Sequence, residues 1–118
     1  MVAAQSYNSQ GAKPTCFYAR RKGGGVAGVL LASYKPGRRQ VKVEHMYVRP
    51  EDRGAGAGKA LLGQVVEAAK RDDRYDEIHT EVARTNSRAR NMVEGLGFES
   101  AGQNLTARSY KLVLTKQR

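Results

Sequence analysis

The sequence has few of the residues that build covalent or metal-bound frameworks. Cys16 is the single cysteine among 118 residues, which excludes a disulfide within the chain and a thiolate zinc cage. No apolar run approaches the roughly 18 residues that a membrane-spanning helix needs. The first residues also lack the basic start and apolar stretch of a signal peptide. These absences predict an intracellular, cytoplasmic protein that has no metal centre and no membrane partner.

Negative charge is missing from the first third of the chain. No Asp or Glu precedes Glu44, whereas eight of the 21 Lys and Arg residues do, and the net charge is +10. Such a one-sided field favours an anionic partner: nucleic acid, the ribosome, an acidic protein face or a phosphorylated small molecule. A solvated basic face without a dedicated partner is the alternative. No zinc-finger spacing, aromatic RNA-binding strand or basic heptad helix accompanies the charge.

The hydrophobic content of 40% is that of a globular chain, and the length suits a single domain. We expect residues 1–14 to form a polar N-terminal arm or a loose strand, followed by one domain over residues 15–118. Strands are predicted over 17–21, 26–34 and 40–48, joined by turns at the glycines of 23–25 and at Pro36. A regular third strand would place Val41, Val43 and His45 on one face and Lys42, Glu44 and Met46 on the other.

After Pro50 the apolar period becomes helical. Leu61 and Val65 repeat at helical spacing within a helix predicted over residues 56–71. A strand at 77–82 follows, and Asn86 is a good N-cap for a second helix that ends at Gly97. Two further strands are predicted over 98–102 and 108–115. The resulting order, β-β-β-α-β-α-β-β, predicts an α+β domain with a mixed, mostly antiparallel sheet.

The loop between residues 48 and 59 is the most informative stretch. It joins a strand to a helix through small residues, so the unpaired N–H groups of the first helical turn can meet an anion. A Walker phosphate loop would need Gly at Arg53 and a hydroxyl at Ala60, and a dinucleotide fingerprint would need Gly at Lys59. The pattern that fits is Arg-x-x-Gly-x-Gly, at Arg53, Gly56 and Gly58.

Two further elements accompany this loop. One is the strand end Met46-Tyr47-Val48-Arg49-Pro50, and the other consists of Asn86, Arg88, Ala89 and Leu96-Gly97-Phe98. With these three elements the sequence resembles the GCN5-related N-acetyltransferase (GNAT) superfamily. The resemblance runs from about Cys16 to Thr115. It implies a GNAT-like fold in which the strands at 40–48 and 77–82 splay into a V that receives acetyl-CoA. The implied function is acetyl transfer from acetyl-CoA to a primary amine by direct attack in a ternary complex.

The resemblance also implies site residues. Residues expected to bind coenzyme A are Met46, Tyr47, Val48, Arg53, Gly54, Ala55, Gly56, Ala57, Gly58, Lys59 and Asn86. The general base is expected at Glu81 or at Glu44, and both remain open. His45 would point away from that side of a regular strand, although a bulge could change this.

Two departures from the family pattern accompany these expectations. Many members carry a tyrosine seven residues after the Asn, where it protonates the leaving thiolate; here that residue is Val93. Tyr110 and Tyr47 are alternative proton donors. Many members also have a strand and two helices before the first hairpin, where this chain has about 14 polar residues. We therefore expect an exposed acceptor side, or one completed by a second subunit in a homodimer, that receives a large anionic protein or nucleic-acid assembly.

Two other functions compete with the enzyme. One is a catalytically weak or inactive acyl-CoA-binding regulator of the same fold, suggested by Val93. The other is a basic nucleic-acid- or ribosome-associated binding module, suggested by the charge.

Overall fold

The computed structural model describes residues 4–8 and 14–115, with side chains described from residue 14 onward. Within these residues the chain forms seven strands, two α-helices and two short 3-10 turns, in the order β1 (Ala4–Asn8), β2 (Thr15–Arg20), β3 (Val26–Lys35), η1 (Pro36–Arg38), β4 (Gln40–Val48), η2 (Pro50–Asp52), α1 (Ala57–Lys70), β5 (Glu77–Ala83), α2 (Ser87–Gly95), β6 (Glu99–Gln103) and β7 (Ala107–Val113). The predicted α+β class is confirmed.

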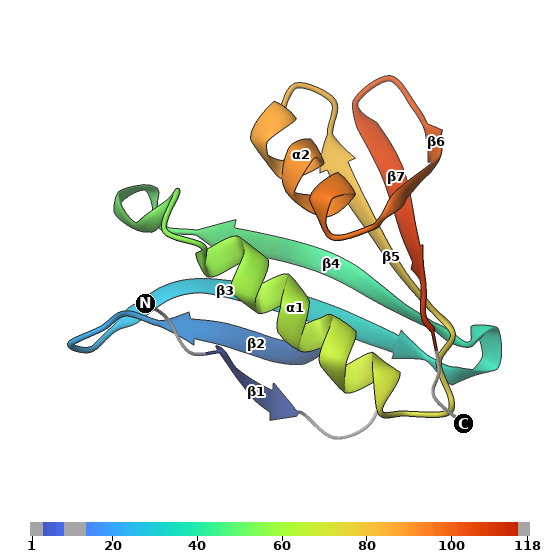
Figure 1. Ribbon diagram of the computed structural model, residues 1–118, viewed down its shortest axis with the longest axis horizontal. Helices are drawn as coiled ribbons and strands as arrows, with labels where there is room; N and C mark the ends of the chain where they lie inside the picture. The colour runs from blue at the N-terminus through green and yellow to red at the C-terminus, as the bar shows by residue number, and fades with distance from the viewer. Residues whose placement is uncertain (1–3, 9–13, 116–118) are drawn as a thin grey trace.

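The strands form one sheet in the order β1-β2-β3-β4-β5-β7-β6. Only β4 and β5 run parallel, and they pair over three positions, Gln40 with Glu77, Val41 with Ile78 and Lys42 with His79. Beyond Lys42 the two strands diverge, and the sheet opens into the two arms seen in Figure 1. The predicted V between these strands is confirmed.

Strand β1 is an addition to the predicted order, because residues 4–8 lie within the segment expected to form an arm or a loose strand. It pairs antiparallel with β2, from Ala4 opposite Ala19 to Asn8 opposite Thr15. Strand β1 therefore extends the sheet beyond β2, at the edge opposite β6.

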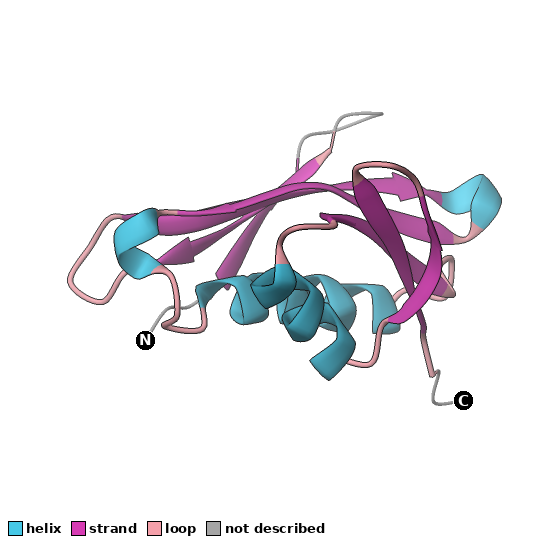
Figure 2. Cartoon of the chain, turned by 90° about the horizontal axis from the view of Figure 1, so that it is seen from above, coloured by secondary structure: helices cyan, strands magenta, loops and turns pink. Residues whose placement is uncertain are grey.

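The core lies between the sheet and the two helices. Leu61, Leu62 and Val65 of α1 are buried and belong to one cluster with Leu30 and Val41 of the strands. Their spacing of three and four residues puts them on one helix face, as the sequence predicts. Both helices lie on the same side of the sheet (Figure 2). No helix of the described chain covers the opposite face, here called the open face.

Candidate functional site

The loop from β4 to α1 is held in place by its own backbone and by one arginine. The amide of Arg49 donates to the carbonyl of Ala27 at 2.8 Å, which fixes the end of β4 to the start of β3. The Arg53 Nε donates to the carbonyl of Val48 at 2.9 Å, and its guanidinium lies 5.6 Å from the centre of the Tyr47 ring. Gly54 and Gly56 then adopt left-handed backbone angles, with φ of 84° and 89°, which residues with a Cβ rarely adopt.

These turns leave a row of backbone donors without partners. No N–H group from Gly54 to Lys59 donates to another group in the described part of the chain, and α1 begins at Gly56 without a side-chain cap. A Cβ at Gly54 or Gly56 would meet no atom within 4 Å, so there is space beside the loop. Unpaired amides, space and a positive helix end together suit a phosphate group.

Acidic residues close to the loop have their charge compensated. Hydrogen bonds from its own amide and from Arg49 lower the pKa of Glu51, so that this carboxylate is charged but paired. Asp52 lies 3.2 Å from the Nε of Arg21. The first turn of α1 contains no acidic residue. The loop therefore fits the diphosphate of coenzyme A, with Arg53 and Lys59 exposed at its edge.

A β-bulge at Glu44 changes the direction of the side chains along β4. Leu31 pairs with His45 and Ala32 with Val43, so Glu44 has no partner on β3. Regular alternation, which would group His45 with Val41 and Val43, is therefore wrong after Val43. Met46 and Val48 pack against the core instead, and His45 and Tyr47 are exposed on the open face.

The edge of β4 that faces the V presents the backbone amides expected to bind the donor. The Arg49 amide points to β3, where it donates to Ala27. Successive N–H groups of a strand point to opposite edges, so the Val48 and Met46 amides point toward the V. There β5 has already diverged and leaves that edge of β4 unpaired.

A cavity of about 290 Å³ occupies the V. It is lined from β4 by Glu44 and Met46, from β5 by Glu81, and from α2 and its cap by Asn86 and Val93. The structure thus brings both candidate bases to one cavity. Asn86, which lines this cavity, also caps α2: its side-chain oxygen accepts from the Ala89 amide at 3.1 Å.

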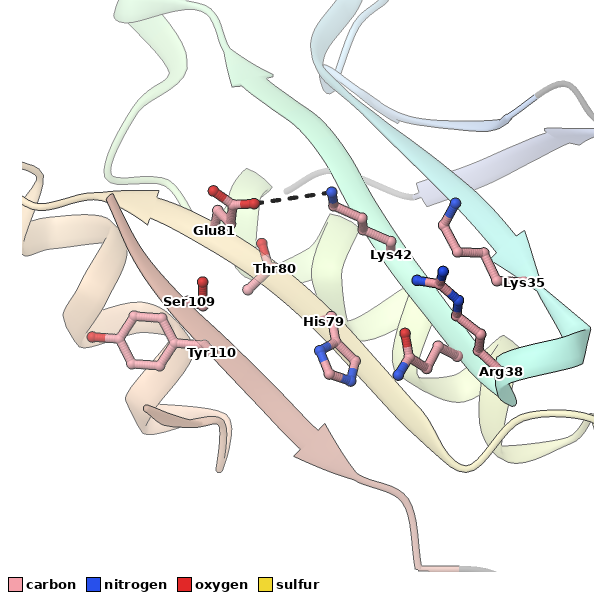
Figure 3. A pocket seen from close by; sticks show the side chains of 9 residues that line it. Lys35, Arg38, Lys42, His79, Thr80, Glu81, Ser109 and Tyr110 are labelled. Atoms are coloured by element: carbon pink, nitrogen blue, oxygen red, sulfur yellow. Dashed lines mark ion pairs between the residues drawn. The ribbon is translucent and has the colours of Figure 1, made fainter. Parts of the chain in front are cut away.

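A second cavity, also about 290 Å³, lies on the open face. Its lining residues are Lys35, Arg38, Gln40, Lys42, His79, Thr80, Glu81, Ser109 and Tyr110. Figure 3 shows Lys42 and Glu81 pointing toward one another across the gap between β4 and β5. Thr80 and Glu81 line both cavities, so Glu81 stands where the two meet. Sequence reasoning singled out the basic run of residues 13–42 but did not place Lys35, Arg38 and Lys42 around Glu81.

Residues 3–98 match the Acetyltransferase (GNAT) family. The chain belongs to the GNAT family. It is 30% identical over 102 residues to mouse N-acetyltransferase 8B, covering 83% of this chain and 44% of that protein. It is 33% identical over 92 residues to mouse N-acetyltransferase 8F1, covering 75% and 41%. The chain thus spans less than half the length of these GNAT relatives.

Solved structures support the GNAT fold. A nourseothricin acetyltransferase superposes with a TM-score of 0.78 at 27% identity, covering 87% of this chain and 66% of that one. The ribosomal-protein-S18-alanine N-acetyltransferase of Escherichia coli superposes with a TM-score of 0.84 at 17% identity, covering 100% and 97%. The second likeness concerns the fold alone.

The tyrosine position of many GNAT members is occupied by a buried aliphatic side chain. Val93 is 2% exposed and lines the cavity of the V. Of the two alternative donors, Tyr110 is 1% exposed, and its hydroxyl donates to Glu94 Oε2 at 2.7 Å, between β7 and α2. Figure 3 shows its ring directed away from Glu81. The Tyr47 ring lies on the open face beside Arg53. Neither tyrosine lines the cavity of the V.

No helix of the described residues is long and apolar enough to cross a membrane. Within residues 4–8 and 14–115 no group of three or more His, Cys, Asp or Glu side chains gathers at one point to hold a metal ion.

Proposed function

We propose that the protein transfers an acetyl group from acetyl-CoA to a primary amine, with donor and acceptor bound together. The observation that supports this most is the position of Glu81, which lines both the cavity of the V and the cavity on the open face. An acyl donor in the first cavity and an amine in the second would meet beside its carboxylate.

The donor side rests on the loop and on β4. The amides from Gly54 to Lys59 would bind the diphosphate, with Arg53 and Lys59 adding charge. The Met46 and Val48 amides and the side-chain amide of Asn86 would bind the pantetheine and the acetyl group. Acetyl-CoA supplies the thioester, and an amide aimed at its carbonyl oxygen stabilises the negative charge that develops there.

The proton and the leaving group are the remaining requirements. Glu81 would accept a proton from the ammonium group of the acceptor, since only the neutral amine can attack. As the new C–N bond forms, the C–S bond breaks and the sulfur leaves as a thiolate. The second proton that the nitrogen loses on becoming an amide passes to this thiolate or to water. A thiol has a pKa of about 8.5, so this departure costs little near neutral pH even with Val93 at the tyrosine position.

Binding and turnover test the proposal separately. Titration calorimetry with acetyl-CoA should give saturable heat, and acetyl-CoA should raise the melting temperature. Thiol release with a panel of primary amines should then show turnover. Absence of both heat and stabilisation at millimolar acetyl-CoA would overturn the proposal.

The second candidate is an acyl-CoA-binding regulator without turnover. It is favoured by the buried Val93 and by Tyr110, whose hydroxyl is engaged by Glu94. Saturable acetyl-CoA binding without thiol release for any amine would identify this function.

A further inference from the structure

Three cationic side chains line one side of the cavity on the open face, and they come from consecutive elements. Lys35 ends β3, Arg38 lies in η1 and Lys42 lies in β4. Their side chains gather on the β4 side of the cavity, opposite His79 and Glu81 of β5 (Figure 3). The tight turn at Pro36 and Gly37 is what returns the chain so quickly that all three line one cavity.

Two of these cations have no carboxylate partner. Within the described residues, Lys35 and Arg38 have no Asp or Glu oxygen within 4.0 Å. Their neighbour Arg39 contrasts with them, because its guanidinium is bonded to Asp76 and to the carbonyl of Asp73. Arg39 therefore makes structural hydrogen bonds to the 73–76 segment, whereas Lys35 and Arg38 line the cavity without a carboxylate partner.

On the β5 side of the cavity, the Glu81 carboxylate already has a cationic partner in Lys42. The Nζ of Lys42 lies 3.9 Å from Glu81 Oε1, and His79 is bonded to Glu77 at 2.8 Å. A second ammonium group brought to Glu81 would be repelled by Lys42, and a diamine or polyamine would also meet Lys35 and Arg38. The same field attracts an anionic group and opposes protonation of an amine beside Lys42, which favours the form that can attack.

We propose that the acceptor is a small primary amine that carries a carboxylate or phosphate a few atoms from its nitrogen. Lys35 and Arg38 bind the anionic group, and the amine lies at Glu81. This proposal rests on the proposed acetyl transfer and adds the acceptor class to it. The cavity volume of about 290 Å³ lies at the lower end of ligand pockets and suits a group the size of an amino acid.

Four amines of similar length test the charge preference. β-Alanine carries a carboxylate, O-phosphoethanolamine a phosphate, propylamine no second charge and 1,3-diaminopropane a second cation. We expect kcat/KM for one or both anionic amines to exceed that for the other two by at least about tenfold, with the larger value identifying carboxylate or phosphate. The preference should shrink between 0.05 and 0.5 M salt, because salt screens exposed charges. Equal values, or a preference for 1,3-diaminopropane, would overturn the proposal.

Double variants test whether Lys35 and Arg38 cause the preference for anionic amines. Lys35→Ala with Arg38→Ala should raise KM for the preferred anionic amine about tenfold and change KM for propylamine less than twofold. Lys35→Glu with Arg38→Glu should reverse the order and favour 1,3-diaminopropane. The matched control, Lys22→Ala with Arg71→Ala, removes the same charge from exposed positions that line neither cavity. An equal loss in the control would assign the effect to net charge and overturn the role of the cavity.

Two readouts separate failure here from failure of the proposed function. Stabilisation by acetyl-CoA reports on the donor site and should be the same in all three double variants. Binding of the four amines, followed by amide NMR shifts of Lys42 and Glu81, reports on the cavity without turnover. Absence of both calorimetric heat and stabilisation by acetyl-CoA in the unmodified protein would refute the proposed function. Intact stabilisation with no tighter binding of the anionic amines would refute the acceptor class alone.

Discussion

Lys42 and Glu81 form an ion pair across the point where β4 and β5 separate, with 3.9 Å between Nζ and Oε1. The two residues are 39 positions apart in the sequence, and each belongs to a different arm of the V. Glu81 lines both the cavity of the V and the cavity on the open face, and Lys42 lines the second of these. Under the proposed function, the pair places a carboxylate beside the site at which an amine would attack.

Glu81→Gln should lower kcat by about 10²- to 10⁴-fold near neutral pH, the usual contribution of a general base. The acetyl-CoA affinity should stay within about twofold, because no loop residue changes. Steady-state kinetics measures kcat, and calorimetry measures the acetyl-CoA affinity. Glu44→Gln is the companion variant, because Glu44 lines the same cavity from the bulge of β4. If Glu44→Gln removes the activity and Glu81→Gln does not, the base is Glu44.

Ala55→Glu should weaken acetyl-CoA binding by at least about tenfold. The new carboxylate would lie among the amides of the loop and repel the diphosphate. Gly56→Glu should do the same, but its φ of 89° also strains any residue with a Cβ, so Ala55→Glu is the cleaner variant. Gly95→Glu, at the exposed end of α2 with no atom within 4 Å of a Cβ, is the charge-matched control. Unchanged affinity in both loop variants would show that the diphosphate binds elsewhere.

Tyr110→Phe should leave kcat within about twofold and cost roughly 0.5–1.5 kcal/mol of stability, the usual contribution of one hydrogen bond. The reason is that the Tyr110 hydroxyl is buried and donates to Glu94 rather than lining the cavity of the V. Thiol-release rates and thermal unfolding measure the two effects. A tenfold loss of kcat with a folded variant would restore Tyr110 as the proton donor.

Val93→Tyr tests whether the leaving thiolate lacks an acid. If protonation limits turnover, a hydroxyl at this position should raise kcat at pH values below the thiol pKa of about 8.5. Val93 is 2% exposed, so the larger tyrosine side chain should also lower the free energy of unfolding by about 1–3 kcal/mol through overpacking. Val93→Phe carries the same bulk without the hydroxyl and is the control. Equal rates for the two variants would show that the acid is not limiting.

Stability should fall at alkaline pH in a way that depends on Tyr34. Burial raises the pKa of the Tyr34 phenol, and Tyr75 and Asp72 act in the same direction, against a hydrogen bond with Thr15. A raised pKa means that the unfolded chain loses this proton first, so the stabilisation is complete below about pH 10 and is lost as pH rises through the folded pKa. Urea unfolding of the protein and of Tyr34→Phe between pH 8 and 11 should show a shallower decline for the variant. Parallel declines would assign the effect to other groups.

Local sequence pattern was sufficient to predict most of the fold and the backbone of the loop at residues 53–59. The apolar spacing of α1, the cap at Asn86 and the glycines at positions 54 and 56 act within a few residues of themselves, so their consequences can be predicted from the sequence. For residues 4–8 the sequence left a loose strand and an arm open, because these residues are largely polar and their pairing with β2 is a contact between segments.

Tertiary structure decided the relations between strands. The bulge at Glu44 depends on how β4 pairs with β3, and it reverses the faces of every later residue in the strand. The ion pair of Lys42 with Glu81, and the cavity that both line with Lys35 and Arg38, depend on β4 and β5 pairing over only three positions before they diverge. The sequence by itself determined that a loop of small residues with the Arg-x-x-Gly-x-Gly pattern follows a strand. Only packing decided which carboxylate and which cations line the cavity on the open face, because those residues are distant in the chain.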